Sequence, residues 1–385
     1  MSSLPFRRIV VIGIGLIGGS VAACLKNIDR DVVVLGIDSE PTTCGRAMEL
    51  GIVDDAAPIG DVRVDQWLSS GGSDVVILAT PARFVPDWLT KMGEGGYDGV
   101  VTDVVSTKSG VVKAARVHLG SAARFVGGHP MAGSERSGVE AARADLFQGA
   151  YWLLTPAGET DADAYMGVHA LVSALGARVV TVEPKIHDEA VAIVSHVPHV
   201  AAAALCDVAG AHAGEGGELL RLAAGGFKDT TRIAAGSPEL WTGICLDNAD
   251  ALASGLRELR MSLGEFEAMV RAKDALAISS WLERAALVRQ SLPAQWVPAT
   301  RDLFELTVPM VDRPGVVAEV TATVSRAACN IEAIDIDHET EDTALLVLVL
   351  TDEGDHQSLM RELTGLGYDP RLRPLNAAAA DESAQ

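Results

Sequence analysis

The sequence predicts three successive parts: an open, doubly wound α/β sheet, an all-α segment and a small α+β domain. Up to about residue 182, short β-branched runs alternate with helical patterns, as expected for parallel strands joined by helices. From there to about residue 291, alanine, leucine and methionine dominate and turn signals are sparse. After a proline-containing linker at 292–301, strand and helix patterns return.

Length and charge limit what the chain can do. Its 385 residues, 48% of them apolar, are enough for two or three domains with substantial cores. The formal net charge of −21, with no basic run to offset it, argues against nonspecific binding of nucleic acid or anionic membrane. A site for an anionic substrate must therefore supply its own positive groups.

Cysteine usage and hydropathy point to the cytoplasm. The five cysteines are scattered and form no C-x-x-C pair, which favours free thiols in a reducing compartment over disulfides or a zinc site. We expect no membrane-spanning segment, because the most apolar stretch, 190–206, is interrupted by His196, Pro198 and His199.

The first strand, predicted at 9–12, leads into a glycine-rich turn. This turn has the pattern G-x-G-x-x-G, formed by Gly13, Gly15, Leu16, Ile17 and Gly18 with one further residue. Glycines at these positions allow a tight turn and let a pyrophosphate approach the N–H groups at the start of the following helix. The motif alone is weak evidence for a dinucleotide site.

Asp38 strengthens the dinucleotide prediction. It follows the second predicted strand, 31–37, and lies 20 residues after Gly18, where an acid can accept hydrogen bonds from ribose hydroxyls. Ser39 and Glu40 come next, so no arginine is placed to bind a 2′-phosphate, and we predict NAD rather than NADP. The alternative is an export signal, with Arg7-Arg8 and a lipid-attachment cysteine at Cys24, but the glycine spacing favours a Rossmann-type site.

A further strand should border the nicotinamide half of the cleft with its carboxyl end, and another strand follows it. One, 74–81, carries Thr80 near its carboxyl end, and the next, 100–103, leads to Ser106 and Lys108. Ser106 is a candidate to hydrogen-bond substrate or cofactor. For Lys108 a solvated lysine at a helix start is slightly favoured over a functional role.

His129 is the candidate catalytic residue. It lies in the glycine-rich block 127–135, directly after the predicted strand 124–126, at the edge where open α/β sheets bind ligands. Imidazole is the side chain best suited to accept a proton near neutral pH. The alternative is a structural loop histidine. Two more strands are predicted at 151–155 and 178–182, with a helix between them at 164–175.

The helical half carries two polar groups of residues. His196 and His199 are three positions apart, but no carboxylate set at ligand spacing accompanies them, so we predict no metal. Arg232, in the block 225–232, is a candidate for bidentate capture of a carboxylate, the alternative being a surface arginine paired with Asp229. Ser237 begins a helix, and wide apolar faces predict a homodimer, against a self-contained helical domain as the alternative.

The last part has the order β-α-β-β-α-β, which is ferredoxin-like. The predicted strands begin near residues 304, 331, 343 and 368, and apolar faces mark helices at 316–324 and 359–366. The tail after Asn376 should be disordered.

Taken together, the glycine loop with Asp38, the block 128–135, the segment 195–199 and the block 226–232 resemble the prephenate dehydrogenase family. The resemblance covers roughly residues 8–291, and residues 302–376 look like an ACT domain, a module that binds amino acids. The sequence departs from the family pattern at Val105, where a glycine is expected.

The resemblance implies NAD-dependent oxidative decarboxylation of prephenate to 4-hydroxyphenylpyruvate in tyrosine biosynthesis, regulated by an aromatic amino acid. It also implies that His129 takes the hydroxyl proton with support from Ser106. The residues that it places in substrate binding are Arg232, His199, Ser134 and Glu135.

We expect a Rossmann domain at 1–184, a helical substrate-binding and dimerisation domain at 185–298, an ACT-like domain at 302–376 and a tail at 377–385. The nearest rival function is arogenate dehydrogenase, which the sequence does not distinguish. A β-hydroxyacid dehydrogenase would use a lysine base such as Lys185 or Lys228, which leaves the histidine block unexplained. A sensor of NAD and amino acids without turnover is the alternative that is not an enzyme.

Overall fold

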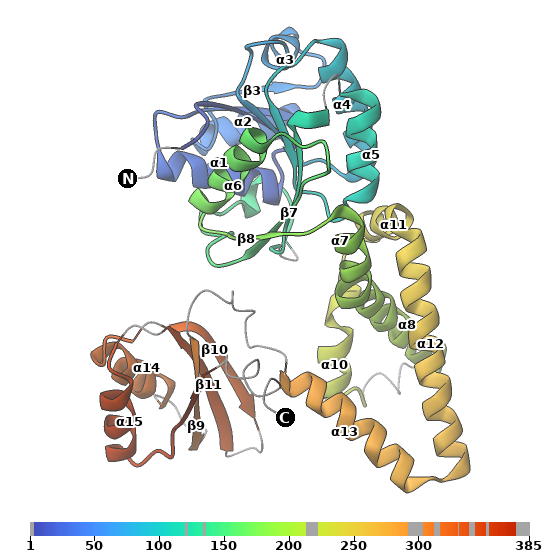
Figure 1. Ribbon diagram of the computed structural model, residues 1–385, viewed down its shortest axis with the longest axis vertical. Helices are drawn as coiled ribbons and strands as arrows, with labels where there is room; N and C mark the ends of the chain where they lie inside the picture. Colours follow the sequence, from blue (N-terminus) through green and yellow to red (C-terminus); the bar gives the residue numbers. More distant parts are fainter. Residues whose placement is uncertain are drawn as a thin grey trace. The chain divides into compact units, whose positions relative to one another are not determined.

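The chain forms two compact units, Met1–Ser262 and Leu263–Gln385, which are described separately. In this computed structural model the described residues are 4–119, 122–133, 136–212, 222–291, 303–311, 316–329, 331–338, 343–351 and 354–374. Figure 1 shows the elements with the labels used below.

The first unit contains a doubly wound sheet, as predicted. Over the described residues it has eight strands in the order β3-β2-β1-β4-β5-β6-β7-β8, all parallel to their neighbours except β7, which is antiparallel to β6. The strands are β1 (Arg8–Ile12), β2 (Val33–Asp38), β3 (Asp55–Pro58), β4 (Val75–Leu78), β5 (Val100–Asp103), β6 (Phe125–Pro130), β7 (Tyr151–Thr155) and β8 (Arg178–Thr181). The strand order reverses at β1, so the ligand crevice of this sheet type lies beyond its carboxyl end.

Helices cover both faces of the sheet (Figure 1). Successive residues of β1 point to opposite faces: Ile9 and Val11 join one core, while Val10 and Ile12 join the other. This burial on both faces explains the unbroken β-branched runs of the sequence. The helices are α1 (Leu16–Ile28), α2 (Pro41–Glu49), α3 (Val62–Trp67), α4 (Val85–Glu94), α5 (Ser109–His118) and α6 (Ala162–Ala174).

The helical segment follows β8. Its elements are α7 (Pro184–Val191), a π-helical turn (Ala192–His196), α8 (Val197–His212), α10 (Gly225–Thr231), the 3₁₀ turn η5 (Arg232–Ala235), α11 (Pro238–Asp247), α12 (Ala249–Ala272) and α13 (Ala275–Ser291). The predicted start of α11 is confirmed: Ser237 caps it, and its hydroxyl accepts a hydrogen bond from the Leu240 N–H.

The predicted interruption of this segment at Pro198 was wrong. The helical run Pro184–His212 is long and apolar enough to cross a membrane by length and composition. Pro198 does not interrupt it: a π-helical turn directly precedes α8, and the chain stays helical through Val197 and the proline. Buried core helices of globular proteins pass the same test, and this run buries His187, Asp188, His196 and His199 in its own unit.

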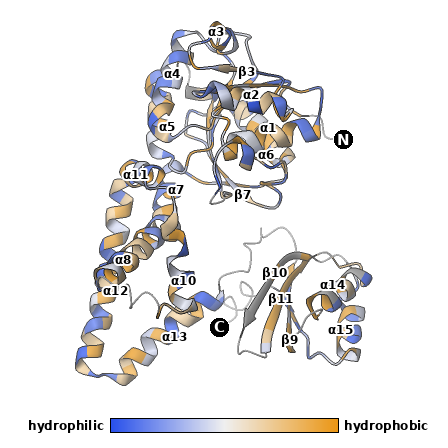
Figure 2. Ribbon diagram, turned by 180° about the vertical axis from the view of Figure 1, so that it is seen from behind, coloured by the Kyte–Doolittle hydropathy of each residue, from blue (hydrophilic) through white to orange (hydrophobic). Residues whose placement is uncertain are grey.

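Large apolar side chains remain exposed on this helical segment, and Figure 2 shows hydrophobic residues along α8 and α12. Those on α8, α11 and α12 of the first unit include Leu205, Val208, Leu240, Leu246 and Met261. Exposed apolar faces of this kind mark interaction surfaces.

The second unit ends in the predicted ferredoxin-like arrangement. Its four-stranded antiparallel sheet has the order β10-β11-β9-β12 over the described residues. The elements are β9 (Leu303–Val311), α14 (Val316–Arg326), β10 (Ile331–His338), β11 (Thr343–Thr351), α15 (His356–Gly365) and β12 (Arg371–Pro374). The predicted linker at 292–301 and the tail after Asn376 lie outside the described residues.

Candidate active site

The glycine loop between β1 and α1 has the shape that a dinucleotide needs. Gly13 has φ +94°, and a Cβ on it would lie 2.6 Å from the Ala79 carbonyl oxygen. A Cβ on Gly18 would lie 2.0 Å from the Gly13 carbonyl oxygen, so only glycine lets α1 pack this closely. A Cβ on Gly15 would meet nothing within 4 Å, so the backbone is open at the N-terminus of α1.

Asp38 fixes this loop against the end of β2. Its carboxylate accepts hydrogen bonds from the Ile14 N–H at 2.9 Å and the Glu40 N–H at 3.0 Å. Thr80, just past β4, has a buried hydroxyl with no hydrogen-bond partner. An open backbone cradle, an acid at the end of β2 and an unsatisfied hydroxyl are features that a bound dinucleotide would use.

His129 lies near the carboxyl end of β6 and is 9% exposed. Its Nδ1 is 2.9 Å from Nε2 of His187, the buried histidine on α7. Burial, with additional effects of the nearby Lys108, His187 and His196, holds the pKa of His129 well below its usual range. His129 is therefore neutral near pH 7 and able to accept a proton.

His187 is held in turn by Asp188. Nδ1 of His187 lies 2.9 Å from the Asp188 carboxylate, which also accepts hydrogen bonds from the backbone N–H groups of Lys108 at 2.7 Å and Ser109 at 2.8 Å. Although burial opposes it, these hydrogen bonds lower the pKa of Asp188. The three side chains form a continuous chain, Asp188–His187–His129.

Lys108 corrects the expectation of a solvated lysine. Its side chain is completely buried and bonds to the buried Asp103 carboxylate and, at 2.6 Å, to the carbonyl oxygen of Gly128. Asp103 also accepts a hydrogen bond from the Gly128 N–H at 3.1 Å. The side chain of Lys108 extends from the start of α5 to the end of β6. Together Lys108 and Asp103 fix the backbone next to His129.

His199 forms an aromatic pair with Trp241. The rings stack with centroids 3.4 Å apart and an interplanar angle of 13°. Nδ1 of His199 is buried without a hydrogen-bond partner. A Cβ on Gly236 would lie 2.7 Å from the Trp241 ring nitrogen and 3.3 Å from His199, so glycine at this position lets the chain pass closely.

His196, which is also buried, has a structural environment. Its Nδ1 lies 3.3 Å from the Asn248 amide, which donates another hydrogen bond to the backbone oxygen of Asp188 at 2.7 Å. Over the part of the chain described here, no three His, Cys, Asp or Glu side chains are grouped as a metal would require.

The remaining predicted residues are placed less directly. Ser106 is half-buried in the loop after β5. Arg232 is exposed on η5, which packs against α8, the helix that carries His199. Ser134 and Glu135 lie outside the described residues.

Comparisons with known proteins match all three parts of the chain. The model of the prephenate dehydrogenase nucleotide-binding domain matches residues 21–181, that of the prephenate dehydrogenase dimerization domain 183–284, and that of the ACT domain 305–367. Prephenate dehydrogenase from Bacillus subtilis is 36% identical over 87% of this chain and 89% of its own length. The chain belongs to the prephenate dehydrogenase family.

Two further members of this family illustrate the likeness. Prephenate dehydrogenase from Lactococcus lactis is 32% identical over 82% of this chain and 86% of its own. The crystal structure of prephenate dehydrogenase from A. aeolicus in complex with hydroxyphenyl propionate and NAD+ is 30% identical, with a TM-score of 0.70. The matched region spans 76% of this chain and 99% of the A. aeolicus chain.

The departure of this family member at Val105 is tolerated by its backbone. Val105 is not among the residues with positive φ, and its N–H donates a hydrogen bond to Asp103 at 3.1 Å. A side chain is therefore compatible with the turn that leads to Ser106.

Sequence reasoning missed several residues of this cluster. They are Asp103, His187, Asp188, Trp241 and Asn248. The adjacent His187-Asp188 pair near the start of an apolar helical run was a usable signal, because two buried ionisable groups need partners. The other contacts join positions far apart in the chain, and no spacing rule connects them.

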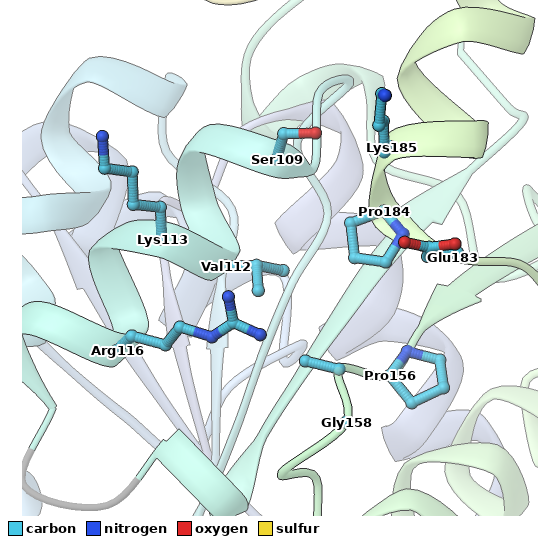
Figure 3. Close-up of a pocket in the computed structure, with 10 residues that line it drawn as sticks. Ser109, Val112, Lys113, Arg116, Pro156, Gly158, Glu183, Pro184 and Lys185 are labelled. Carbon is cyan, nitrogen blue, oxygen red and sulfur yellow. The ribbon is translucent and has the colours of Figure 1, made fainter.

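A surface cavity of about 470 Å³ lies elsewhere on this unit (Figure 3). It opens between α5, the turn after β7 and the start of α7, and it contains no predicted site residue. Lys113, Arg116 and Lys185 line it, and Arg116 is paired with Glu159.

Proposed function

We propose that the protein is an NAD-dependent prephenate dehydrogenase that oxidises and decarboxylates prephenate to 4-hydroxyphenylpyruvate. The observation that carries this proposal is His129, a buried neutral imidazole at the carboxyl edge of the sheet that contains the glycine loop. Membership of the prephenate dehydrogenase family over most of the chain supports it.

The glycine loop, Asp38 and Thr80 suit the cofactor. Gly13 makes the turn, Gly18 lets α1 pack closely against it, and Gly15 with the backbone N–H groups of Leu16 and Ile17 would hold a pyrophosphate. Asp38, at the end of β2, would accept hydrogen bonds from the adenosine ribose, and the unpaired Thr80 hydroxyl would bind on the nicotinamide side. NAD, when bound, supplies the acceptor for the hydride.

The residues of this chain supply binding and the base. His129 takes the proton of the C4 hydroxyl as the hydride leaves C4, and the ring becomes aromatic when the ring carboxylate departs as carbon dioxide. Ser106 supports His129, and Arg232 binds a carboxylate of the dianionic substrate, assisted by His199, Ser134 and Glu135.

Arogenate differs from prephenate in having an amine in place of the keto group of the side chain. It stays the alternative substrate, because no described residue is assigned to that group. A test is to incubate the purified full chain with NAD and prephenate. We expect NADH, carbon dioxide and 4-hydroxyphenylpyruvate in equal amounts; NADH without carbon dioxide would contradict the proposed reaction.

We also propose that the protein works in the cytoplasm as a homodimer. The exposed apolar residues of α8, α11 and α12 supply an interface, and the match to a dimerization domain supports this use. Sedimentation at increasing protein concentration tests it: a dimer is expected, and a monomer at all concentrations would contradict the assignment. The domain boundaries 1–184, 185–298 and 302–376 remain our proposed division.

The ACT domain suggests control by an aromatic amino acid. We expect tyrosine added to the assay to change the rate and to bind in calorimetry. Unchanged rates together with no binding of tyrosine, phenylalanine or tryptophan would leave the domain a structural role.

A further inference from the structure

The buried chain Asp188–His187–His129 extends beyond the residues that the reaction itself requires. His187 is completely buried, Asp188 is 5% exposed, and neither is among the substrate or cofactor residues proposed above. Burying an imidazole and a carboxylate is costly unless both are hydrogen-bonded. Here the atoms that face each side chain are known donors or acceptors. The position of each hydrogen along Asp188–His187–His129 can therefore be assigned.

The assignment starts at Asp188. Its carboxylate accepts two backbone N–H groups at the start of α5, which favours the ionised form, and an ionised carboxylate can only accept. Nδ1 of His187, 2.9 Å away, must therefore carry a hydrogen and donate it. In a neutral His187 the other nitrogen, Nε2, is then an acceptor.

The hydrogen position on His129 follows from the same donor and acceptor argument. Its Nδ1 lies 2.9 Å from Nε2 of His187, so this Nδ1 donates and carries the hydrogen. The remaining nitrogen of a neutral His129, Nε2, is left with a free electron pair. The rings meet edge to face with an interplanar angle of 67°, which fixes the orientation of the His129 ring as well as its tautomer.

We propose that His187 and Asp188 are positioning residues that fix His129 in the Nδ1–H tautomer, so that Nε2 is the atom that accepts the substrate proton. The role follows from the hydrogen-bond chain and from its anchor at α5. It deepens the proposed function, since a base in the wrong tautomer presents a hydrogen where it must accept one.

The surroundings of His129 agree with this role. The charged and titratable groups that face it are Lys108 from the loop before α5, His187 and Asp188 from α7, and His196 from the π-helical turn. Lys108 is engaged by Asp103 and the Gly128 carbonyl, and His196 by Asn248. Among them only His187 is hydrogen-bonded to the His129 ring.

The direct test is ¹⁵N NMR of the histidine side chains in the full-length protein without substrate. The His129 signals, assigned by their loss in His129→Asn, should show a hydrogen on Nδ1 and none on Nε2. Asp188→Asn can donate to Nδ1 of His187, which reverses the chain, and His129 should then carry its hydrogen on Nε2. A wild-type His129 with its hydrogen on Nε2 would overturn the proposal, and this result does not depend on whether Asp188→Asn folds.

Steady-state kinetics provide a second test of the positioning role. His187→Leu removes the acceptor and should lower kcat on the order of 100-fold with KM for prephenate within roughly threefold, whereas His187→Gln keeps an amide oxygen and should recover part of kcat. The control is Asp161→Asn, because Asp161 also accepts backbone N–H groups at a helix start, that of α6. We expect Asp188→Asn to lose far more kcat than Asp161→Asn; equal losses would contradict a positioning role.

The two proposals fail in different ways. If wild-type protein does not turn over prephenate, the proposed function fails, while the tautomer measurement still decides the hydrogen-bond chain. If prephenate is turned over and the His187 variants keep wild-type kcat, only the positioning role is wrong.

Discussion

At the scale of single residues, His129 shows how its environment keeps a common side chain neutral. It lies in a buried strand end and its neighbours include a lysine and two histidines, all of which oppose a positive charge. The glycines before it let Lys108 and Asp103 reach the backbone at its side. The sequence predicted the histidine, and the structure supplies the reason for its neutrality.

The pH dependence of activity tests this environment. Since the base must be neutral, kcat/KM falls as pH drops through the His129 pKa, and this limb should lie below the ordinary imidazole value of about 6.5. His129→Asn should lower kcat on the order of 10²- to 10⁴-fold and abolish the limb. A variant profile with the wild-type shape, merely scaled down, would remove His129 as the base.

Arg232 is the residue-scale prediction for substrate binding. Arg232→Ala should raise KM for prephenate by tens of fold with a smaller effect on kcat, because a charge-assisted hydrogen bond contributes about 1.5–3 kcal/mol. The matched control is Arg7→Ala, an exposed arginine paired with Asp29 at the far end of β1, which should leave KM unchanged. An unchanged KM in Arg232→Ala would exclude the arginine from the site.

At the scale of elements, two glycines of the loop between β1 and α1 should have different roles, one in NAD binding and one in stability. Gly15→Ala adds a methyl group to open space and should weaken NAD binding with little change in unfolding free energy. Gly18→Ala puts a methyl group against the Gly13 carbonyl and should destabilise the protein by about 1–3 kcal/mol. Calorimetric NAD titration and urea unfolding measure the two effects, and equal behaviour of the two variants would contradict the assigned cradle.

The connection between β5 and α5 carries the buried ion pair. Lys108→Met leaves the Asp103 carboxylate buried without its cation, so the free energy of unfolding should fall by about 3–5 kcal/mol. The double variant Lys108→Met/Asp103→Leu should recover part of this loss. A solvated lysine would instead give a change within about 0.5 kcal/mol in urea unfolding.

The elements themselves were largely predictable, whereas their mutual contacts were not. Runs of β-branched residues and glycine spacing are local signals, and they identified β1, β2, β4 and the ferredoxin-like order. The predicted helix break at Pro198 was wrong: a π-helical turn precedes the proline, and the chain stays helical. Lys108 was misjudged because burial of a lysine depends on an acid and a carbonyl that the fold brings to it.

At the scale of the whole molecule, the first unit contains both groups of candidate site residues. The sheet supplies the glycine loop and His129, and the helical segment supplies His187, Asp188, His199 and Trp241. The apolar side chains that remain exposed on α8, α11 and α12 form the surface at which we propose that a second copy of the chain binds.

The central claim is that this site oxidises prephenate with NAD, and a turnover panel of prephenate and arogenate with NAD and NADP tests it most directly. We predict the highest kcat/KM for prephenate with NAD, and a large loss with NADP because Asp38 repels a 2′-phosphate and no arginine follows it. A higher kcat/KM for arogenate would make arogenate, and not prephenate, the preferred substrate. No turnover of either compound with either cofactor would contradict the account.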